Sequence, residues 1–336
     1  MAPWRRTTRT RIGLDYGSRR FKAAQLSAAG GRWRIDAVAE MPRATTSAVP
    51  EPGELKQLAD LLGHSGFKGH SLVVAVPETK VMSGVLELPP RTSGAPLDVL
   101  ARTELARMHK RSPESFEMTC WDLPAPARAA NSTFVMAAGL VHTDAAALMD
   151  AFEGQGFDVE CLTTHAAAVT AACGPLLAKP GGLAAILDLG WVSARVLLMH
   201  QTVVVYERAL GEFGLAGLAG RLGGAPGAEG RLWAEGVSGK PDVSTPVKTH
   251  FQRLAGELRI ALSYLANQYS DAELAGLYLT GGGAGLPGLC ELLGGILDVP
   301  VHAVCPSELD ECPPSLASQC GPAFVDAIGL CRLEAR

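Results

Sequence analysis

Short apolar runs that end in a glycine-rich turn recur along this chain, and the most pronounced is Leu277–Leu289. Its first three residues are typical of a buried strand, four of the six residues over 280–285 are glycine, and Pro287 is predicted to begin a helix. Backbone without a Cβ can contact a ligand closely, and N–H groups at a helix start can face it, which is how glycine turns hold nucleotides. A tight connection with no ligand explains this turn alone equally well.

A polar turn over 15–22 lies between two alternating segments near the start of the chain, and a further strand is predicted after the glycine pair at 30–31. The pattern predicts an antiparallel meander. Asp15, at a strand end, can hold a hydrated divalent cation, and Lys22 can balance its charge from the next strand. Gly17 and Ser18 can turn N–H and hydroxyl groups toward phosphate. Taken alone, an ordinary hairpin with a polar tip is the simpler interpretation.

The same pattern returns 173 positions after Asp15, where an apolar strand ends at Asp188 and Gly190. Two more strands are predicted over 195–199 and 202–206. The repetition predicts two halves of like architecture that face each other across a cleft, with the glycine turn at 281 as a third wall.

These segments have counterparts in a known family. IGLDYGSRRFKAAQL resembles the first phosphate loop of the actin-like ATPase superfamily, AAILDLGWVSARVLLMHQTVVVYERAL the second, LYLTGGGAGLPGL the adenosine loop and AFVDAIGLCRLEA the closing helix. Between the first two loops, SLVVAVPETKVMSGVLELP and LDVLARTELARMHKRSPESFEMTCWDL resemble the inserted subdomain of the PilM family of type IV pilus assembly proteins, which are FtsA-like. The resemblance extends from Arg11 to Glu334.

The resemblance implies an α/β, bilobed actin-like ATPase fold of two ribonuclease-H-like lobes. A small α+β subdomain is inserted in the first lobe, and the second lobe carries a helical subdomain. The implied division is 11–70 (first lobe with the first phosphate loop), 71–141 (inserted partner-binding subdomain), 142–181 (return to the first lobe), 182–210 (second lobe with the second phosphate loop), 211–275 (helical subdomain) and 276–336 (adenosine loop and closing helix of the second lobe).

The resemblance also implies ATP and Mg²⁺ as cofactors. Asp15 and Asp188 would hold Mg²⁺ through water, and Glu257 on the long helix of the second lobe would contact the ribose. A solvated Glu257 is an equally good interpretation. The remaining implied cofactor-binding residues are those of the two phosphate loops and the adenosine loop: Gly17, Ser18, Arg19, Lys22, Gly190, Ser193, Gly281, Gly282 and Gly283.

The chain departs from its relatives at positions that bear on catalysis. Ala194 replaces a hydroxyl residue, Trp191 places an indole that either crowds the phosphates or packs into its lobe, and Arg19 replaces a small polar residue. Relatives that hydrolyse ATP well carry Glu or Gln in the linking helix to orient water, where this chain offers Thr163 and Thr164. Loss of general-base assistance typically costs about 10²–10⁴ in rate, so we expect nucleotide binding with slow or absent turnover.

The inserted subdomain is predicted as one helix flanked by strands Leu72–Val76 and Phe134–Leu140. Glu104 lies on the apolar face of the helix and is expected at its rim, although an anchoring role or a peptide contact is an alternative. By resemblance, the groove between this subdomain and the first lobe binds the cytoplasmic amino-terminal tail of a PilN-like inner-membrane protein. The apolar face of the helix comprises Leu97, Leu100, Ala101, Leu105 and Met108.

Composition narrows the class of protein. With 336 residues, 47% hydrophobic and 19% charged, the chain can bury the cores of two lobes. A formal charge of -4 gives no support for nucleic-acid binding. No run of about 18 apolar residues occurs, so we expect no membrane span and only peripheral membrane association. The eight cysteines include no Cys-x-x-Cys pair, as expected for free thiols in the cytoplasm, and the irregular set His302, Cys305, Cys312 and Cys320 is a poor zinc site.

The favoured hypothesis is a cytoplasmic ATP-binding scaffold, at most a weak ATPase, that joins a pilus or related secretion machine beneath the inner membrane. A degenerate structural homologue that binds no nucleotide is one alternative. A sugar-kinase-like enzyme on the same fold is another, but it needs a catalytic aspartate opposite the phosphates and a roomy substrate pocket, and the insertion in this chain is in the wrong place for one. A filament-forming ATPase is the last, and the missing water-positioning residue counts against it.

Overall fold

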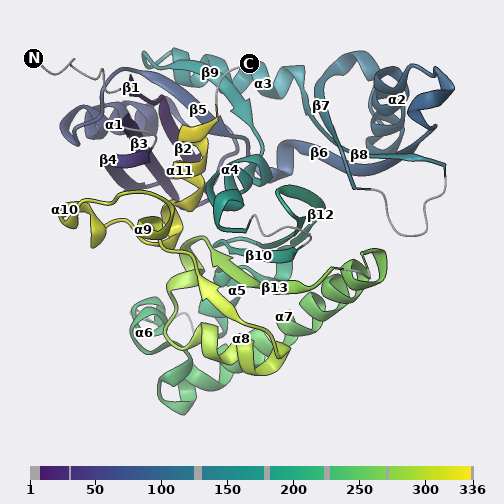
Figure 1. Ribbon diagram of the computed structural model, residues 1–336. Helices are drawn as coiled ribbons and strands as arrows, with labels where there is room; N and C mark the ends of the chain where they lie inside the picture. Colours follow the sequence, from purple (N-terminus) through teal and green to yellow (C-terminus); the bar gives the residue numbers. More distant parts are fainter. Residues whose placement is uncertain are drawn as a thin grey trace, which may run out of the picture.

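The computed structural model shows two lobes, each built on a β-sheet, with a smaller subdomain beside the first lobe (Figure 1). The structure describes residues 8–29, 32–124, 131–177, 182–222, 228–269 and 272–333. The predicted turn at the glycine pair 30–31 lies outside the described residues.

A sheet of six strands organises the first lobe, in the order β1-β3-β2-β5-β9 with β4 paired to β3. The antiparallel meander predicted from the alternating pattern is confirmed as β2–β3–β4, and β5 and β9 run parallel to β2. Apolar faces of helices α1 (Pro52–His64) and α3 (His142–Glu153) pack on this sheet. The strands are β1 (Thr8–Arg9), β2 (Ile12–Tyr16), β3 (Arg20–Ala29), β4 (Arg32–Pro42), β5 (Ser71–Ala75) and β9 (Asp158–Thr163).

The prediction that Leu72–Val76 flanks the inserted helix is wrong. Strand β5 pairs with β2 and β9, so it is an interior strand of the first lobe. Its uninterrupted apolar sequence suits a parallel strand that is buried on both faces.

The inserted subdomain is a separate three-stranded antiparallel sheet, ordered β6-β8-β7, with one helix packed on it. Ala101 and Leu105 of α2 are fully buried as predicted, but Met108 is 46% exposed at the end of the face. Glu104 pairs with Arg107 at the edge of the helix, which confirms the expected rim position. The elements are β6 (Val81–Leu88), α2 (Leu97–His109), β7 (Phe116–Asp122) and β8 (Thr133–Val141).

The second lobe repeats the architecture of the first. Its sheet has the order β12-β11-β10-β13-β14, in which β10, β11 and β12 form a meander and β13 and β14 run parallel to β10. The predicted likeness of the two halves is therefore confirmed strand by strand. The strands are β10 (Leu183–Leu189), β11 (Ala194–His200), β12 (Val203–Leu210), β13 (Leu274–Thr280) and β14 (Val301–Ala303).

Helices cover one face of the second sheet and form the helical subdomain (Figure 1). The long α7 (Pro241–Gln268) begins six residues before the predicted Val247, because Pro241 occupies a first-turn position where its missing N–H costs nothing. Its companions are α5 (Leu215–Arg221), α6 (Ala228–Glu235) and α8 (Leu289–Leu297). Among the described helices, none has both the length and the apolar character that a membrane crossing requires.

Two helices pass between the sheets, α4 (His165–Leu177) and α11 (Val325–Arg332). Small residues let them approach each other and the first sheet: a Cβ on Gly329 would lie 1.9 Å from the carbonyl oxygen of Ala168, and one on Gly13 would lie 2.1 Å from that of Ala327. The grouping of the closing helix with the second lobe is wrong, because α11 packs on β2 and β3 of the first. The short helices α9 (Pro306–Leu309) and α10 (Pro314–Ala317) connect the second lobe to α11 in the first lobe.

Candidate functional site

The first-lobe turn carries an aspartate and a lysine held together. Asp15 near the end of β2 lies directly opposite Lys22 of β3, and Nζ of the lysine is 2.6 Å from Oδ2 of the aspartate. The Gly17 N–H closes the turn by donating to the Arg20 carbonyl at 3.0 Å. Both charged side chains are largely buried, with exposed fractions of 13% for Lys22 and 11% for Asp15. The predicted charge pair is thus present within one hairpin.

Carboxylates of both lobes act on Lys22. Burial alone would lower its pKa, but the Asp15 carboxylate, with those of Asp326 and Asp188 beyond it, raises the pKa above its ordinary value of 10.5. The lysine is therefore charged at neutral pH, and it lies within the electrostatic reach of Asp188 from the second lobe.

The second-lobe turn is held by α5, the helix that follows the meander of β10, β11 and β12. The Gly190 N–H donates to the Ser193 carbonyl at 3.0 Å, and the Gly190 carbonyl accepts from the Leu215 N–H at 3.2 Å. A Cβ on Gly214 would lie 2.2 Å from the Val192 carbonyl oxygen, so α5 begins in direct contact with the turn. Asp188, the last residue but one of the preceding strand, has an exposed fraction of only 8%.

Arg19 and Trp191 connect the two turns. The Arg19 guanidinium carbon lies 4.1 Å from the centroid of the Trp191 ring, a cation–π distance. The indole packs against the second-lobe core, which favours the interpretation that it is tucked into its lobe. The phosphate contact predicted for Arg19 stays a prediction.

The glycine turn after β13 lies against Asp188. Gly281 has a φ of 79°, and a Cβ there would lie 2.2 Å from Oδ1 of Asp188. Gly283 abuts Leu189 in the same way, with a Cβ position 2.7 Å from that side chain, whereas Gly282 faces open space. Only glycine suits position 281, because it needs both a left-handed backbone and room for the carboxylate.

The predicted helix start at Pro287 is wrong. A short 3₁₀ turn over Gly282–Gly285 follows the strand, Gly288 adopts a left-handed φ of 75°, and α8 begins at Leu289. A left-handed residue interrupts a right-handed helix, so the proline belongs to the connection.

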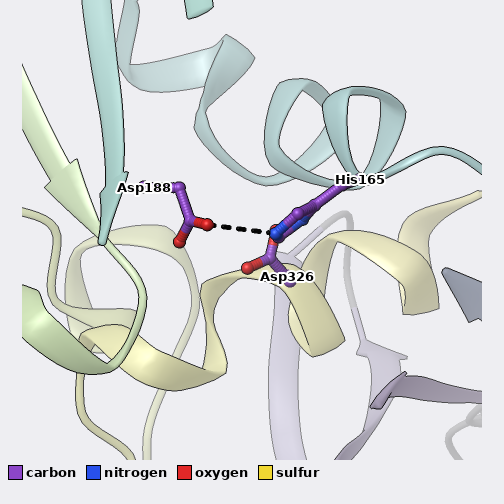
Figure 2. A group of neighbouring side chains, drawn as sticks. All are labelled: His165, Asp188 and Asp326. Carbon is purple, nitrogen blue, oxygen red and sulfur yellow. Dashed lines mark hydrogen bonds and ion pairs between the residues drawn. The ribbon is translucent and has the colours of Figure 1, made fainter. Parts of the chain in front are cut away.

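His165 and Asp326 complete the site, and neither was predicted. His165 begins α4, and its Nε2 lies 3.2 Å from Oδ2 of Asp188, while its Nδ1 lies 2.7 Å from Oδ1 of Asp326 on α11 (Figure 2). Asp326 is only 1% exposed. A charged residue inside the apolar closing helix was the available signal for Asp326; the signal for His165 was its place beside Thr164 at the head of the linking helix.

The charges of this cluster depend on one another. Burial would lower the pKa of His165, but Asp326 and Asp188 raise it well above the ordinary value of 6.5, so the imidazole is protonated at neutral pH. Burial would raise the pKa of Asp188, but His165 and Arg195 hold it below its ordinary value. Burial raises the pKa of Asp326, which also faces the like charges of Asp188 and Asp15.

Glu257 is paired within the second lobe. Its Oε2 lies 3.1 Å from Nη2 of Arg208 on β12, and its side chain is 30% exposed. This ion pair joins two partly exposed side chains, so Glu257 remains in contact with solvent. Its predicted contact with a ribose stays a prediction and would compete with this ion pair.

A cavity of about 260 Å³ lies where the first lobe, the inserted subdomain and the second lobe meet. Arg195 of β11 lines it, with Nη2 2.5 Å from Oε2 of Glu78 and Nε 3.6 Å from Oε1 of Glu207. His165 also lines this cavity, so one side chain borders both the cavity and the Asp188 cluster. Its other lining residues include Val76, Ser83 and His109.

No protein-family model and no curated protein matches the sequence. Among solved structures, the chain is similar to the "PilM-PilN type IV pilus biogenesis complex", with 20% identity, a TM-score of 0.78 and coverage of 96% of this chain and 97% of that chain. It is also similar to the ethanolamine utilization protein EutJ from Carboxydothermus hydrogenoformans (14% identity, TM-score 0.55, coverage 97% and 90%). A third similar structure is MreB 5 of Spiroplasma citri bound to AMPPNP (11% identity, TM-score 0.53, coverage 95% and 93%). These likenesses confirm the bilobed actin-like fold.

Proposed function

We propose that this chain, which has the actin-like fold, is a cytoplasmic ATP-binding scaffold of type IV pilus or related secretion-system assembly, peripheral to the inner membrane. The observation that supports it most is the convergence of charged turns from both lobes. Lys22 of the first lobe lies in the field of Asp188 of the second, and Gly281 touches Asp188. A triphosphate needs such a meeting of cation and glycine backbone.

The nucleotide would lie between the two turns. Ser18, Arg19 and Lys22 would contact phosphates from the first lobe, and Gly17, Gly190 and Ser193 would frame them. Gly281–Gly283 would contact base and sugar, and Glu257 the ribose once released from Arg208.

Asp15 and Asp188 would hold Mg²⁺ through water. The carboxylate chemistry suits this hard cation, and Asp188 is kept ionised by its neighbours. When bound, Mg²⁺ supplies positive charge that offsets the phosphates.

Slow turnover follows from the head of the linking helix, where Thr163 and Thr164 stand in place of the Glu or Gln that orients water in family members that hydrolyse ATP well. The chain therefore keeps its nucleotide rather than consuming it quickly.

The partner in this proposal is the cytoplasmic amino-terminal tail of a PilN-like inner-membrane protein. The solved structure with the TM-score of 0.78 is a complex with PilN, and it shares the architecture of this chain. The cavity between Val76 of the first lobe and His109 of the inserted subdomain is the candidate end of the binding groove.

Equilibrium binding of a fluorescent ATP analogue, with and without Mg²⁺, tests the nucleotide proposal. We expect saturable binding that Lys22→Ala and Asp188→Ala weaken, and that the exposed α1 variants Lys56→Ala and Asp60→Ala leave unchanged. Absence of saturable binding at millimolar nucleotide favours the degenerate homologue. Parent-like binding by both site variants means that the phosphate site lies elsewhere.

Capture of a synthetic PilN-like tail tests the partner proposal. Ser83→Trp fills the cavity from the inserted subdomain and is expected to abolish capture, as is deletion of Val85–Leu123. Thr103→Trp, on the exposed side of α2, serves as the matched control. Unchanged capture by Ser83→Trp contradicts this location of the groove.

A further inference from the structure

Two residues at which this chain departs from its relatives, Arg19 and Trp191, contact each other across the two lobes. Arg19 lies in the turn between β2 and β3, and Trp191 lies in the turn between β10 and β11. The guanidinium carbon lies over the indole ring, 4.1 Å from its centroid. A cation at this position is attracted by the face of the ring. The contact therefore joins the phosphate turn of one lobe to that of the other.

Trp191 is the fixed partner in this contact. Its carbonyl oxygen accepts a hydrogen bond of 2.8 Å from the Ala216 N–H of α5, and a Cβ on Gly214 would lie 2.6 Å from the same oxygen. The indole also packs against the hydrophobic core of the second lobe. Since both its backbone and its ring are held, Trp191 determines where the guanidinium of Arg19 lies.

Arg19 has a fixed backbone and a side chain that reaches into solvent. Its carbonyl oxygen accepts a hydrogen bond of 2.8 Å from the Arg43 N–H, and the residue is exposed. Fixing a long exposed side chain on a ligand costs rotamer freedom, which weakens binding about two- to tenfold for each such side chain. Contact with a fixed ring removes part of this cost before the ligand arrives.

The contact with the ring uses only the face of the guanidinium. The N–H donors of arginine point outward in the plane of the group, in a fork that matches two phosphate oxygens. Stacking on an indole and donation to a phosphate are therefore compatible. The ring restricts the tilt of the guanidinium plane and thereby the direction of its donors.

We propose that Trp191 is a positioning residue for nucleotide binding, whose ring holds the guanidinium of Arg19 in the orientation that binds a phosphate group. Because the two residues belong to different lobes, this phosphate contact depends on both lobes. The inference rests on the proposed function and refines how the first lobe would hold the phosphates. It opposes the interpretation that the indole crowds the phosphates, in which removal of the ring would strengthen binding.

The experiment measures the affinity of the full chain for a fluorescent ATP analogue with Mg²⁺. Trp191→Leu keeps an apolar side chain without a ring, and it should weaken binding about two- to tenfold. Trp191→Phe restores a ring and should recover most of the affinity. Arg19→Ala should weaken binding at least as much as Trp191→Leu. The double variant should bind as Arg19→Ala does, because the ring acts through the guanidinium.

Trp33→Leu is the matched control, because it removes a partly buried indole at the end of β4 far from the phosphate turn. It should bind the analogue as the parent does. Should Trp191→Leu fail to fold, Trp191→Met takes its place, because the flexible methionine side chain fills irregular space.

Three results overturn the proposal: tighter binding by Trp191→Leu, an equal loss with and without Arg19→Ala, and no recovery of affinity by Trp191→Phe. A parent chain that binds the analogue no better than Trp191→Leu does also overturns it and leaves the proposed function standing. A parent chain that shows no saturable binding at millimolar nucleotide contradicts the proposed function and this inference together.

Discussion

The two lobes present the same strand–turn–strand unit to the space between them, yet they neutralise its aspartate by different means. In the first lobe, Asp15 is paired with Lys22 from the adjacent strand of its own hairpin. In the second, Asp188 depends on His165 from α4, and Gly281 leaves room for it.

The first unit is therefore complete within eight residues, whereas the second is assembled from elements far apart in the chain. A self-contained pair forms whenever the hairpin folds. The contacts around Asp188 form only when the two lobes and the helices between them have packed together. These contacts therefore depend on the relative position of the lobes.

The largest expected effect is on the free energy of unfolding when the first unit loses its cation. Lys22→Met leaves the buried Asp15 carboxylate unpaired and should cost about 3–5 kcal/mol. His165→Gln should cost less, about 1–3 kcal/mol, because Arg195 and Lys22 still act on Asp188. Urea unfolding measures both losses.

The double variant Asp15→Asn with Lys22→Met is the control and should recover most of the loss, because it removes both charges of the pair. Equal losses in Lys22→Met and His165→Gln would show that the two units are held in the same way.

A second effect separates the glycines of the two units. Gly281→Ala places a Cβ 2.2 Å from Oδ1 of Asp188 at a φ of 79° and should cost about 2 kcal/mol or more. Gly17→Ala meets nothing nearer than the Arg20 carbonyl at 3.6 Å and should change stability by less than about 1 kcal/mol. Thermal unfolding followed by circular dichroism compares them, and a tolerated Gly281→Ala contradicts the close packing of the second unit.

The smallest expected effect concerns the contact between the units. Arg19→Ala removes the guanidinium from the Trp191 face and should cost about 0.5–1 kcal/mol. Loss of this contact should change the fluorescence emission of Trp191. The variant Trp191→Phe identifies the contribution of Trp191 among those of the five tryptophans.

Arg20→Ala is the matched control, because Arg20 pairs with Glu40 inside the first lobe. An emission change in Arg20→Ala as large as in Arg19→Ala would mean that Trp191 does not report on the contact between the lobes.

The sequence predicted the structural features that form between residues close together in the chain. The alternation of apolar and polar residues predicted the two antiparallel meanders. The positions of Asp15 and Lys22 on adjacent strands predicted their charge pair. The resemblance supplied the order of loops and the fold that the solved structures confirm.

What escaped prediction depends on contacts between distant segments. The apolar run of β5 does not say which sheet it joins, and no periodicity in α11 shows that it returns to the first lobe. His165 and Asp326 are 161 positions apart, and only the packing of α4 against α11 brings their side chains together. Pro287 was misplaced because the left-handed backbone of Gly288 is set by the connection around it.

A crystal structure grown with a non-hydrolysable ATP analogue tests the central claim, that both units hold one triphosphate. The account predicts a γ-phosphate between the first turn, at Lys22, and the second, at Gly190, with the base beside Gly282. An analogue bound to one lobe only, or away from both turns, would contradict it.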